Sequence, residues 1–293
     1  MLDRRGFLSG SIALLAAGCR STSRDIVVGS KNFTEQLILG ELFAQMLEHS
    51  CRTTIDRRFY LAGTYICQQA ILARRIDVYP EYTGTALAAV LKQHASGNAA
   101  QVFDEVKHQY RQKFDLVVMP PLGFNNSFAM AMRGEDARRF GLTKLSQLAP
   151  LAPPMRLGVG YEFLERQDGY QGLVRTYGLR FAEPPHVMDL GLLYRALQNR
   201  SVDIVAGSNT DGLIAALGLV VLEDDMHYFP PYDAVAIVRP ELLVRHPAAQ
   251  NAFDSLAGRI TADAMRMMNY AVDGERKDSA AVVAQFLQQK TLV

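Results

Sequence analysis

The sequence predicts an α/β protein of two lobes, each a mostly parallel β-sheet flanked by helices. Three observations predict this fold class. The chain has 293 residues, which is too long for one small core and suits two lobes of ordinary size. Strand and helix patterns alternate along much of it, as in open parallel sheets. Two apolar strands interrupt the alternation, and a second lobe inserted into the first requires two chain crossings.

The first unit covers residues 25–49 and is predicted to be a strand, a loop and a helix. Residues 25–28 are apolar enough for a short buried strand. Asn32 suits a helix N-cap, and Glu35 follows three residues later, as a capping box requires. Apolar residues then recur at helical spacing to the end of the unit. Lys31 therefore lies in a loop at a helix N-terminus, where free amide groups favour an anion.

The same order of elements recurs twice further along the chain. Each copy has a helix, a strand and a second helix: 64–74, 77–79 and 83–91 in the first, and 190–198, 203–206 and a helix opening at 210–212 in the second. The copies can be aligned from Asp77 and Asp203, which places Ser208 opposite Tyr82. Ligands of such sheets lie beyond the carboxyl ends of the strands, so both residues are candidates for a binding site.

Two apolar strands, 127–132 and 234–238, have no alternating helix between them and their neighbours. Each follows a turn-rich stretch, PPLGFNN and FPPYD respectively. We therefore expect the chain to leave one lobe near its middle and to return near residue 230. The predicted lobes are 25–122 with 227–293, and 123–226.

The first 24 residues are predicted to be a targeting segment that takes no part in the fold. DRRGFL resembles the twin-arginine export signal, and LAAGC resembles a bacterial lipobox in which Cys19 becomes the lipidated first residue. Leu15 lies one place further from Cys19 than usual, so an ordinary signal peptide with general export is the alternative. The apolar run is too short for a spanning helix. The mature chain is therefore expected to be periplasmic and anchored to a membrane through Cys19.

Composition and motifs argue against several other functions. The net charge of +1 gives no electrostatic footprint for nucleic acid. The histidines are scattered and neither Cys51 nor Cys67 lies in a CxxC motif, so no metal or other cofactor is expected. There is no GxSxG or HExxH motif to favour an enzyme. Export permits a disulfide between Cys51 and Cys67, and two free buried thiols are the open alternative.

Six segments occur together in the order and spacing of one known family: SKNFTEQ, IDVYPEYTGT, GFNNSFAMAM, FLERQDG, NTDG and LEDDMHYFPPYDA. They resemble the substrate-binding proteins of osmoprotectant ABC importers, which bind glycine betaine, choline, carnitine and related compounds. The resemblance covers essentially the whole mature chain. It implies a type II periplasmic-binding-protein fold that closes by hinge motion, acts as a monomer, and has a membrane permease and an ATPase as partners.

The chemistry of such ligands explains which residues a site needs. A trimethylammonium group has no N–H to donate, but the faces of aromatic rings attract it by about 0.5 to 2 kcal/mol each. A betaine carboxylate instead needs a lysine, an arginine, a hydroxyl or a helix N-terminus. We therefore expect tyrosines beside one cationic corner.

The resemblance assigns roles to five residues that match family motifs. Tyr82 and Tyr232 match aromatic walls of the cage around the methylated nitrogen. Lys31 and Thr85 match groups that bind the ligand carboxylate, and Arg166 matches an arginine that reaches this carboxylate from the other lobe.

Two further site residues depart from the family pattern. Phe128 stands where a tyrosine is frequent, which keeps the ring and loses the hydroxyl. Ser208 stands where the family commonly has a cage tyrosine, so one wall is expected to be missing unless Tyr161 or Tyr228 completes it.

Structural explanations remain open for several of these residues. Tyr82 could fill the strand-to-helix junction, and Arg166 could pair with Asp168 or Glu162 on its own surface. Asp211, at the start of a helix, is expected to be structural because a carboxylate there meets the helix dipole.

The predicted function is therefore that of an extracytoplasmic solute-binding protein of an ABC importer, with a quaternary ammonium osmoprotectant as ligand. The alternatives are a binding protein for another small zwitterion or amino-acid-like solute, an exported enzyme, and a scaffold pair of lobes that has lost its ligand. The serine at position 208 keeps the last alternative open.

Overall fold

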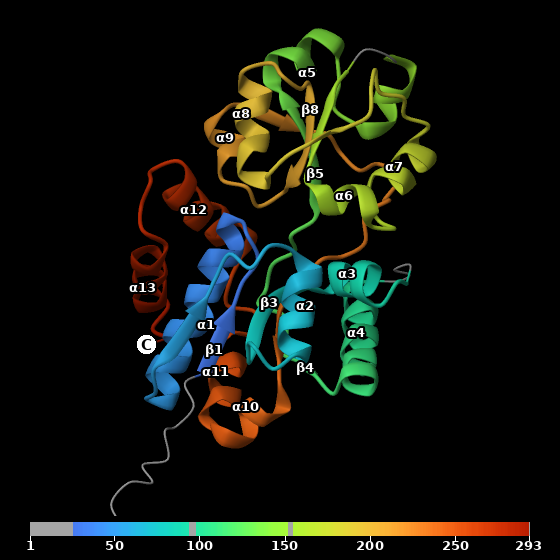
Figure 1. Cartoon of the computed structure of the whole chain (residues 1–293). Helices are drawn as coiled ribbons and strands as arrows, with labels where there is room; N and C mark the ends of the chain where they lie inside the picture. Colours follow the sequence, from blue (N-terminus) through green and yellow to red (C-terminus); the bar gives the residue numbers. More distant parts are fainter. Residues whose placement is uncertain (1–25, 94–97, 152–154, 293) are drawn as a thin grey trace, which may run out of the picture.

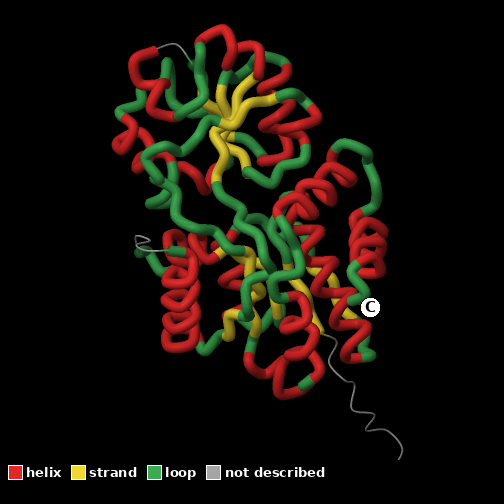
Figure 2. Tube along the Cα trace, turned by 180° about the vertical axis from the view of Figure 1, so that it is seen from behind, coloured by secondary structure: helices red, strands yellow, loops and turns green. Residues whose placement is uncertain are grey.

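The computed structural model of the chain describes residues 26–93, 98–151 and 155–292. The predicted targeting segment, with Cys19, lies outside the described residues. The strands form two separate five-stranded sheets, and each sheet lies in its own lobe (Figure 1). Seen from behind, the two sheets are joined only by extended connecting segments (Figure 2).

The first sheet has the strand order β2-β1-β3-β10-β4. Its strands are β1 (Ile26–Gly29), β2 (Ile55–Arg58), β3 (Val78–Tyr82), β4 (Val117–Val118) and β10 (Ala234–Val238). β1 is parallel to β2 and β3, whereas β10 is antiparallel to β3 and β4. Four strands therefore run in one direction, and β10 runs against them.

The second sheet repeats this arrangement with the order β7-β6-β8-β5-β9. Its strands are β5 (Phe128–Arg133), β6 (Leu157–Val159), β7 (His186–Val187), β8 (Ile204–Ser208) and β9 (Leu219–Val221). β6 is parallel to β7 and β8, and β5 is antiparallel to β8 and β9. The two reversed strands, β5 and β10, are the two apolar strands predicted to follow the chain crossings.

Helices cover both faces of each sheet (Figure 1). In the lobe of the first sheet they are α1 (Thr34–Cys51), α2 (Thr64–Leu72), α3 (Thr83–Thr85), the π-helix Ala86–Val90, α4 (Ala99–Phe114), α10 (Pro240–Arg245), α11 (Ala248–Leu256), α12 (Ala262–Asp273) and α13 (Ser279–Gln289). In the other lobe they are α5 (Gly134–Phe140), α6 (Tyr161–Glu165), α7 (Tyr170–Tyr177), α8 (Leu193–Gln198) and α9 (Leu213–Ala216), with 3-10 helices at Leu145–Leu151 and Leu190–Leu192.

The interior strand β10 is apolar throughout because both of its faces are covered. Ala234, Ala236 and Val238 belong to the core beneath α1, α11, α12 and α13. Val235 and Ile237 belong to the core on the opposite face, beneath α2 and α4. Successive side chains of a strand point to opposite faces of the sheet, so an unbroken apolar run is needed where helices lie on both sides.

One local prediction near the cleft is wrong, and a second is confirmed with an unexpected helical geometry. The N-cap of α1 is Phe33, in extended conformation and without a side-chain cap, so Asn32 and Glu35 do not form a capping box. The Glu35 side chain is instead held by partners far away in the sequence. The helix expected over 83–91 is one α-helical turn followed by the π-helix Ala86–Val90.

The two connecting segments run side by side between the lobes. Asn125 and Asp233 form an isolated antiparallel bridge, and the Asn126 amide donates to the Tyr232 carbonyl at 3.0 Å. The predicted boundaries, after residues 122 and 226, precede these segments, and we keep them as a proposal. Paired extended segments of this kind are suited to act as a hinge.

Candidate functional site

A cavity of about 460 Å³ lies between the two lobes. Tyr82 ends β3 and Ser208 ends β8, so the carboxyl ends of equivalent strands from the two sheets meet at this cavity. All seven predicted ligand-binding residues contribute to its wall: Lys31, Tyr82, Thr85, Phe128, Arg166, Ser208 and Tyr232. The structure therefore brings the seven residues together at one cavity, and their role in binding a ligand stays a prediction.

Lys31 is buried and forms an ion pair inside the protein. Only 3% of its side chain is exposed, and its Nζ atom contacts Oε1 of the fully buried Glu81. The ammonium group also lies 5.0 Å from the centroid of the Tyr82 ring. Burial raises the pKa of Glu81, and the charge of Lys31 opposes the rise. The positive charge predicted to receive a ligand carboxylate therefore has a carboxylate partner already.

Arg166 is bound in the same way by a carboxylate of its own loop. Its Nε and Nη2 atoms donate to Asp168 at 2.8 and 2.5 Å, and the Tyr232 hydroxyl donates to the same carboxylate at 2.5 Å. Its Nη1 atom donates to the Thr85 hydroxyl at 3.1 Å. Of the alternatives set out above, pairing with Asp168 is the one observed. The contact with Thr85 joins the second lobe to the first.

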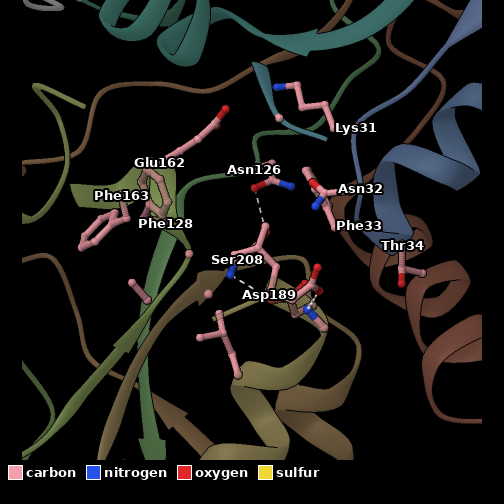
Figure 3. A pocket seen from close by; sticks show the side chains of 18 of the residues that line it. Lys31, Asn32, Phe33, Thr34, Asn126, Phe128, Glu162, Phe163, Asp189 and Ser208 are labelled. Atoms are coloured by element: carbon pink, nitrogen blue, oxygen red, sulfur yellow. Dashed lines mark hydrogen bonds between the residues drawn. The ribbon is translucent and has the colours of Figure 1, made fainter. Parts of the chain in front are cut away.

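The aromatic side chains of the site form a cluster rather than an open cage. The Phe128 ring lies 4.8 Å from Phe163 and 5.8 Å from Tyr232, both edge to face. The Arg166 guanidinium lies 5.0 Å from the Phe128 centroid and 5.7 Å from that of Tyr232. Figure 3 shows Phe128 and Phe163 together on one side of the cavity. The guanidinium of Arg166 thus already contacts two of the rings, Phe128 and Tyr232, that were predicted to surround the ligand cation.

Glu35 is a buried residue beside the cavity whose connecting position sequence reasoning missed. This buried carboxylate accepts hydrogen bonds from the Tyr82 hydroxyl at 2.7 Å, the Thr210 hydroxyl at 2.5 Å, Asn269 at 3.1 Å, and Asn126. Burial raises its pKa, and the four donors oppose the rise. The donors come from both lobes and from a connecting segment, so one carboxylate ties the three parts together. The only signal in the sequence was its place in the SKNFTEQ motif.

Ser208 takes part in the same polar network. Its hydroxyl donates to Oδ1 of Asn126 at 2.7 Å and lies 2.8 Å from the hydroxyl of Thr210; Figure 3 shows the bond to Asn126. Its amide donates to Asp211 at 2.9 Å. Burial raises the pKa of Asp211 to about 7, and hydrogen bonds from Tyr194 and the Ser208 amide oppose the rise. Position 208 therefore offers the cavity a hydroxyl where a ring was expected from the family pattern.

The two tyrosines considered as replacements for that ring differ in position. Tyr161 lies on the cavity wall and is 44% exposed. The Tyr228 hydroxyl instead donates to the Gly169 carbonyl at 3.0 Å, and Tyr228 lies outside the cavity wall. Sequence reasoning missed Tyr60, which faces the cavity from the other lobe and is 57% exposed.

Other chemistry finds little support in the part of the chain that the structure describes. Within it, no group of three or more histidine, cysteine, aspartate or glutamate side chains is placed to hold a metal ion. None of its helices combines the length and apolar character needed to cross a membrane. Cys51 and Cys67 are both free thiols. Burial raises the pKa of Cys67 to about 12, which leaves it an unreactive thiol.

Comparison with known proteins gives consistent matches along the chain. The family described as the substrate-binding domain of ABC-type glycine betaine transport systems matches residues 24–289. The glycine-betaine-binding protein of Pseudomonas aeruginosa is 33% identical over 291 residues, covering 96% of this chain and 92% of the relative. The carnitine transport binding protein OpuCC of Listeria monocytogenes is 30% identical over 275 residues, covering 93% and 89%. A crystal structure described as a glycine betaine/carnitine/choline ABC transporter has a TM-score of 0.75 and 30% identity, covering 92% and 99%.

Proposed function

Because the chain belongs to the family of substrate-binding domains of ABC-type glycine betaine transport systems, we propose that it binds a quaternary ammonium solute between its lobes. Its fold is the type II periplasmic-binding-protein fold. Family membership makes it a transport binding protein and not an enzyme. The relatives named above are described as binding carnitine and glycine betaine, and the proposed ligand is a compound of that class.

One observation carries the proposal: the cavity wall is rich in aromatic rings from both lobes. The rings are Phe33, Tyr60, Tyr82, Phe128, Tyr161, Phe163, Tyr194 and Tyr232. A methylated nitrogen cannot be held by hydrogen bonds, whereas ring faces attract it. The volume of about 460 Å³ falls within the range of about 300 to 1,000 Å³ that is usual for small-ligand sites.

Within this site we propose that Tyr82, Phe128 and Tyr232 form walls against the ligand and that Thr85 offers it a hydroxyl. The role predicted for Lys31 and Arg166, binding of a ligand carboxylate, stays a prediction, and the ion pairs of both residues argue against it.

The transport role implies partners in the membrane. Binding proteins of ABC importers act outside the cytoplasm and deliver their solute to a membrane permease. We propose that this chain works as a monomer in the periplasm with an ATPase-driven permease, anchored through lipid on Cys19. Export by the twin-arginine or the general route is part of this proposal. Replacing Cys19 with serine should release the mature chain into the soluble periplasmic fraction.

The proposed function is tested by calorimetric titration with choline, glycine betaine, carnitine and the neutral carbon isostere of choline. We expect at least one trimethylammonium compound to bind with one site per chain. The isostere, which keeps the shape and lacks the charge, should bind at least about tenfold more weakly because cation–π attraction is lost. Equal binding of choline and its isostere would contradict the proposal.

Ligand-induced stabilisation distinguishes a transporter component from a scaffold without ligand. A true ligand at about 100 times its Kd raises the free energy of unfolding by about 2.7 kcal/mol. A scaffold would show no shift with any of these solutes.

The missing wall is tested by Ser208→Tyr, which should tighten binding of a trimethylammonium ligand if a ring at this position faces it.

A further inference from the structure

We propose that the cavity selects a ligand of net positive charge, such as choline, over a zwitterion, and that Glu162 sets this preference. The inference rests on the proposed function and concerns the same cavity. It follows from how the charged side chains of the wall are paired.

The two basic residues expected to receive a ligand carboxylate are each neutralised by a buried acid. Side-chain exposure is 3% for Lys31 and 0% for Glu81, and it is 5% for Arg166 and 8% for Asp168. A ligand carboxylate that took over either cation would leave Glu81 or Asp168 buried without its partner. Breaking a buried ion pair in this way is strongly unfavourable.

The remaining charge around the cavity is mainly negative. The basic residues on the wall are Lys31, Arg166 and Arg276, and the acidic ones that add negative charge are Glu162, Asp189 and Asp273; Asp211 also lies there, but burial raises its pKa to about 7 and leaves it partly protonated at neutral pH. Glu81 and Asp168 add two further carboxylates directly behind the wall. A ligand with net positive charge offsets this excess, and the carboxylate of a zwitterion adds to it.

Glu162 is the acidic residue best placed to act on a ligand. Its Oε1 atom is buried and has no hydrogen-bond partner among the described residues. Its carboxyl group lies against Gly63 of the other lobe, where any Cβ atom would overlap it. In Figure 3 the Glu162 side chain lies across the cavity from the 31–34 loop.

A carboxylate with one oxygen free of hydrogen bonds suits a quaternary ammonium group in particular. Such a group has no N–H, so it interacts with a carboxylate through charge alone and needs no hydrogen-bond geometry. Two opposite charges a few ångströms apart attract more strongly at the effective dielectric constant of a partly buried site than they do in water. After screening and desolvation we expect a preference for choline over glycine betaine of about tenfold or more.

The first test is the ratio of two dissociation constants for the unmodified chain. Calorimetric titration should give a Kd for choline at least about tenfold below that for glycine betaine. If both bind and glycine betaine binds as tightly as choline, the charge selection is overturned while the proposed function stands. If neither choline, glycine betaine nor carnitine binds, the proposed function fails and the inference fails with it.

The second test assigns the preference to Glu162. Glu162→Gln removes the charge and keeps the shape; Glu165→Gln makes the same change on the same helix at an exposed residue outside the cavity wall. We expect Glu162→Gln to weaken choline binding about tenfold and to leave glycine betaine unchanged or tighter. The control, Glu165→Gln, should change neither the affinity for choline nor that for glycine betaine. An equal loss for both ligands would overturn the role given to Glu162.

Discussion

At the scale of single residues, Tyr82 shows how one side chain serves both the ligand site and the fold. Its ring lies on the cavity wall, while its hydroxyl donates to the buried Glu35 at 2.7 Å. The side chain is 4% exposed and belongs to the main core cluster of its lobe. Truncation of Tyr82 to alanine therefore removes core packing as well as a wall, and it is expected to lower the free energy of unfolding by about 3 kcal/mol or more.

Removing only the hydroxyl separates the two tasks. Tyr82→Phe leaves Glu35 with one donor fewer, so the free energy of unfolding should fall by about 1 to 2 kcal/mol. The ring stays in place, so ligand affinity should change by less than about threefold. Urea denaturation and calorimetric titration measure the two effects. Tyr270→Phe, at a tyrosine that is 39% exposed, is the matched control and should change neither quantity.

Asp211 gives the chain a dependence of stability on pH whose sign can be stated. Its pKa is about 7 in the folded protein, against an ordinary value of 3.8, so the folded state holds this proton more tightly than the unfolded state. Its contribution to stability is therefore complete below about pH 4 and is lost as the pH rises to about 7. The burial of Glu35 raises its pKa and acts in the same direction.

Asp211→Asn should weaken the dependence of the free energy of unfolding on pH. The group contributes a fall of up to about 1.4 kcal/mol in the free energy of unfolding per pH unit within that window. Urea denaturation at several pH values measures the slope for the unmodified chain and the variant. A variant whose slope matches that of the unmodified chain would show that the carboxyl group of Asp211 titrates at its ordinary pKa.

At the scale of elements, α6 determines how closely the second lobe approaches the first. The backbone of Gly63 has φ −96°, which any residue can adopt. A Cβ atom there would nevertheless overlap the Glu162 carboxyl group and lie 2.6 Å from the Tyr161 hydroxyl. The glycine therefore leaves room for the ends of the Glu162 and Tyr161 side chains, and backbone conformation does not require it.

Gly63→Ala should displace the Glu162 carboxyl group and the Tyr161 hydroxyl from their places against the first lobe. We expect ligand affinity to fall at least about tenfold, because the cavity loses its close contact on this side. The free energy of unfolding of the ligand-free chain should change by less than about 1 kcal/mol, since each lobe keeps its own core. Titration and small-angle X-ray scattering measure the effect. Unchanged affinity would mean that the Glu162 and Tyr161 side chains can move without weakening ligand binding.

The sequence predicted the elements that carry a clear pattern and missed those that do not. β5 and β10 were recognisable because each is an apolar run with no helix between it and the preceding strand. The two-residue strands β4 and β7 are too short to show any period, and only their partners in the sheet define them. The helix after Tyr82 was placed correctly, but its π-helical geometry has no signal in the residues 86–90.

At the scale of the whole molecule, the lobes meet at several places around the cavity. The Arg166 guanidinium contacts Thr85 at one of them, and the Thr210 hydroxyl contacts Glu35 at a second. The site residues were predictable from motifs, because each motif is contiguous. Their partners were not, because the Glu35 and Thr210 side chains are 175 positions apart and meet only when both lobes are folded.

Thr210→Val tests the second meeting place. The substitution keeps the side-chain shape and removes one donor from a buried carboxylate, so the contact between the lobes weakens by about 1 to 3 kcal/mol. Ligand affinity should fall about three- to tenfold, and scattering should show a larger radius of gyration for the ligand-bound chain. Thr176→Val, on the exposed face of α7, is the control. If Thr210→Val binds ligand with unaltered affinity, the hydrogen bond between Thr210 and Glu35 does not contribute to closure of the lobes.

A crystal structure of the chain saturated with choline would show whether a methylated cation binds in the cavity between the lobes. We expect choline in that cavity, with its nitrogen within about 6 Å of at least two of the ring centroids on the wall and with the Glu162 carboxylate nearby. An empty cavity in a chain shown by titration to be saturated, or choline bound elsewhere on the surface, would contradict it.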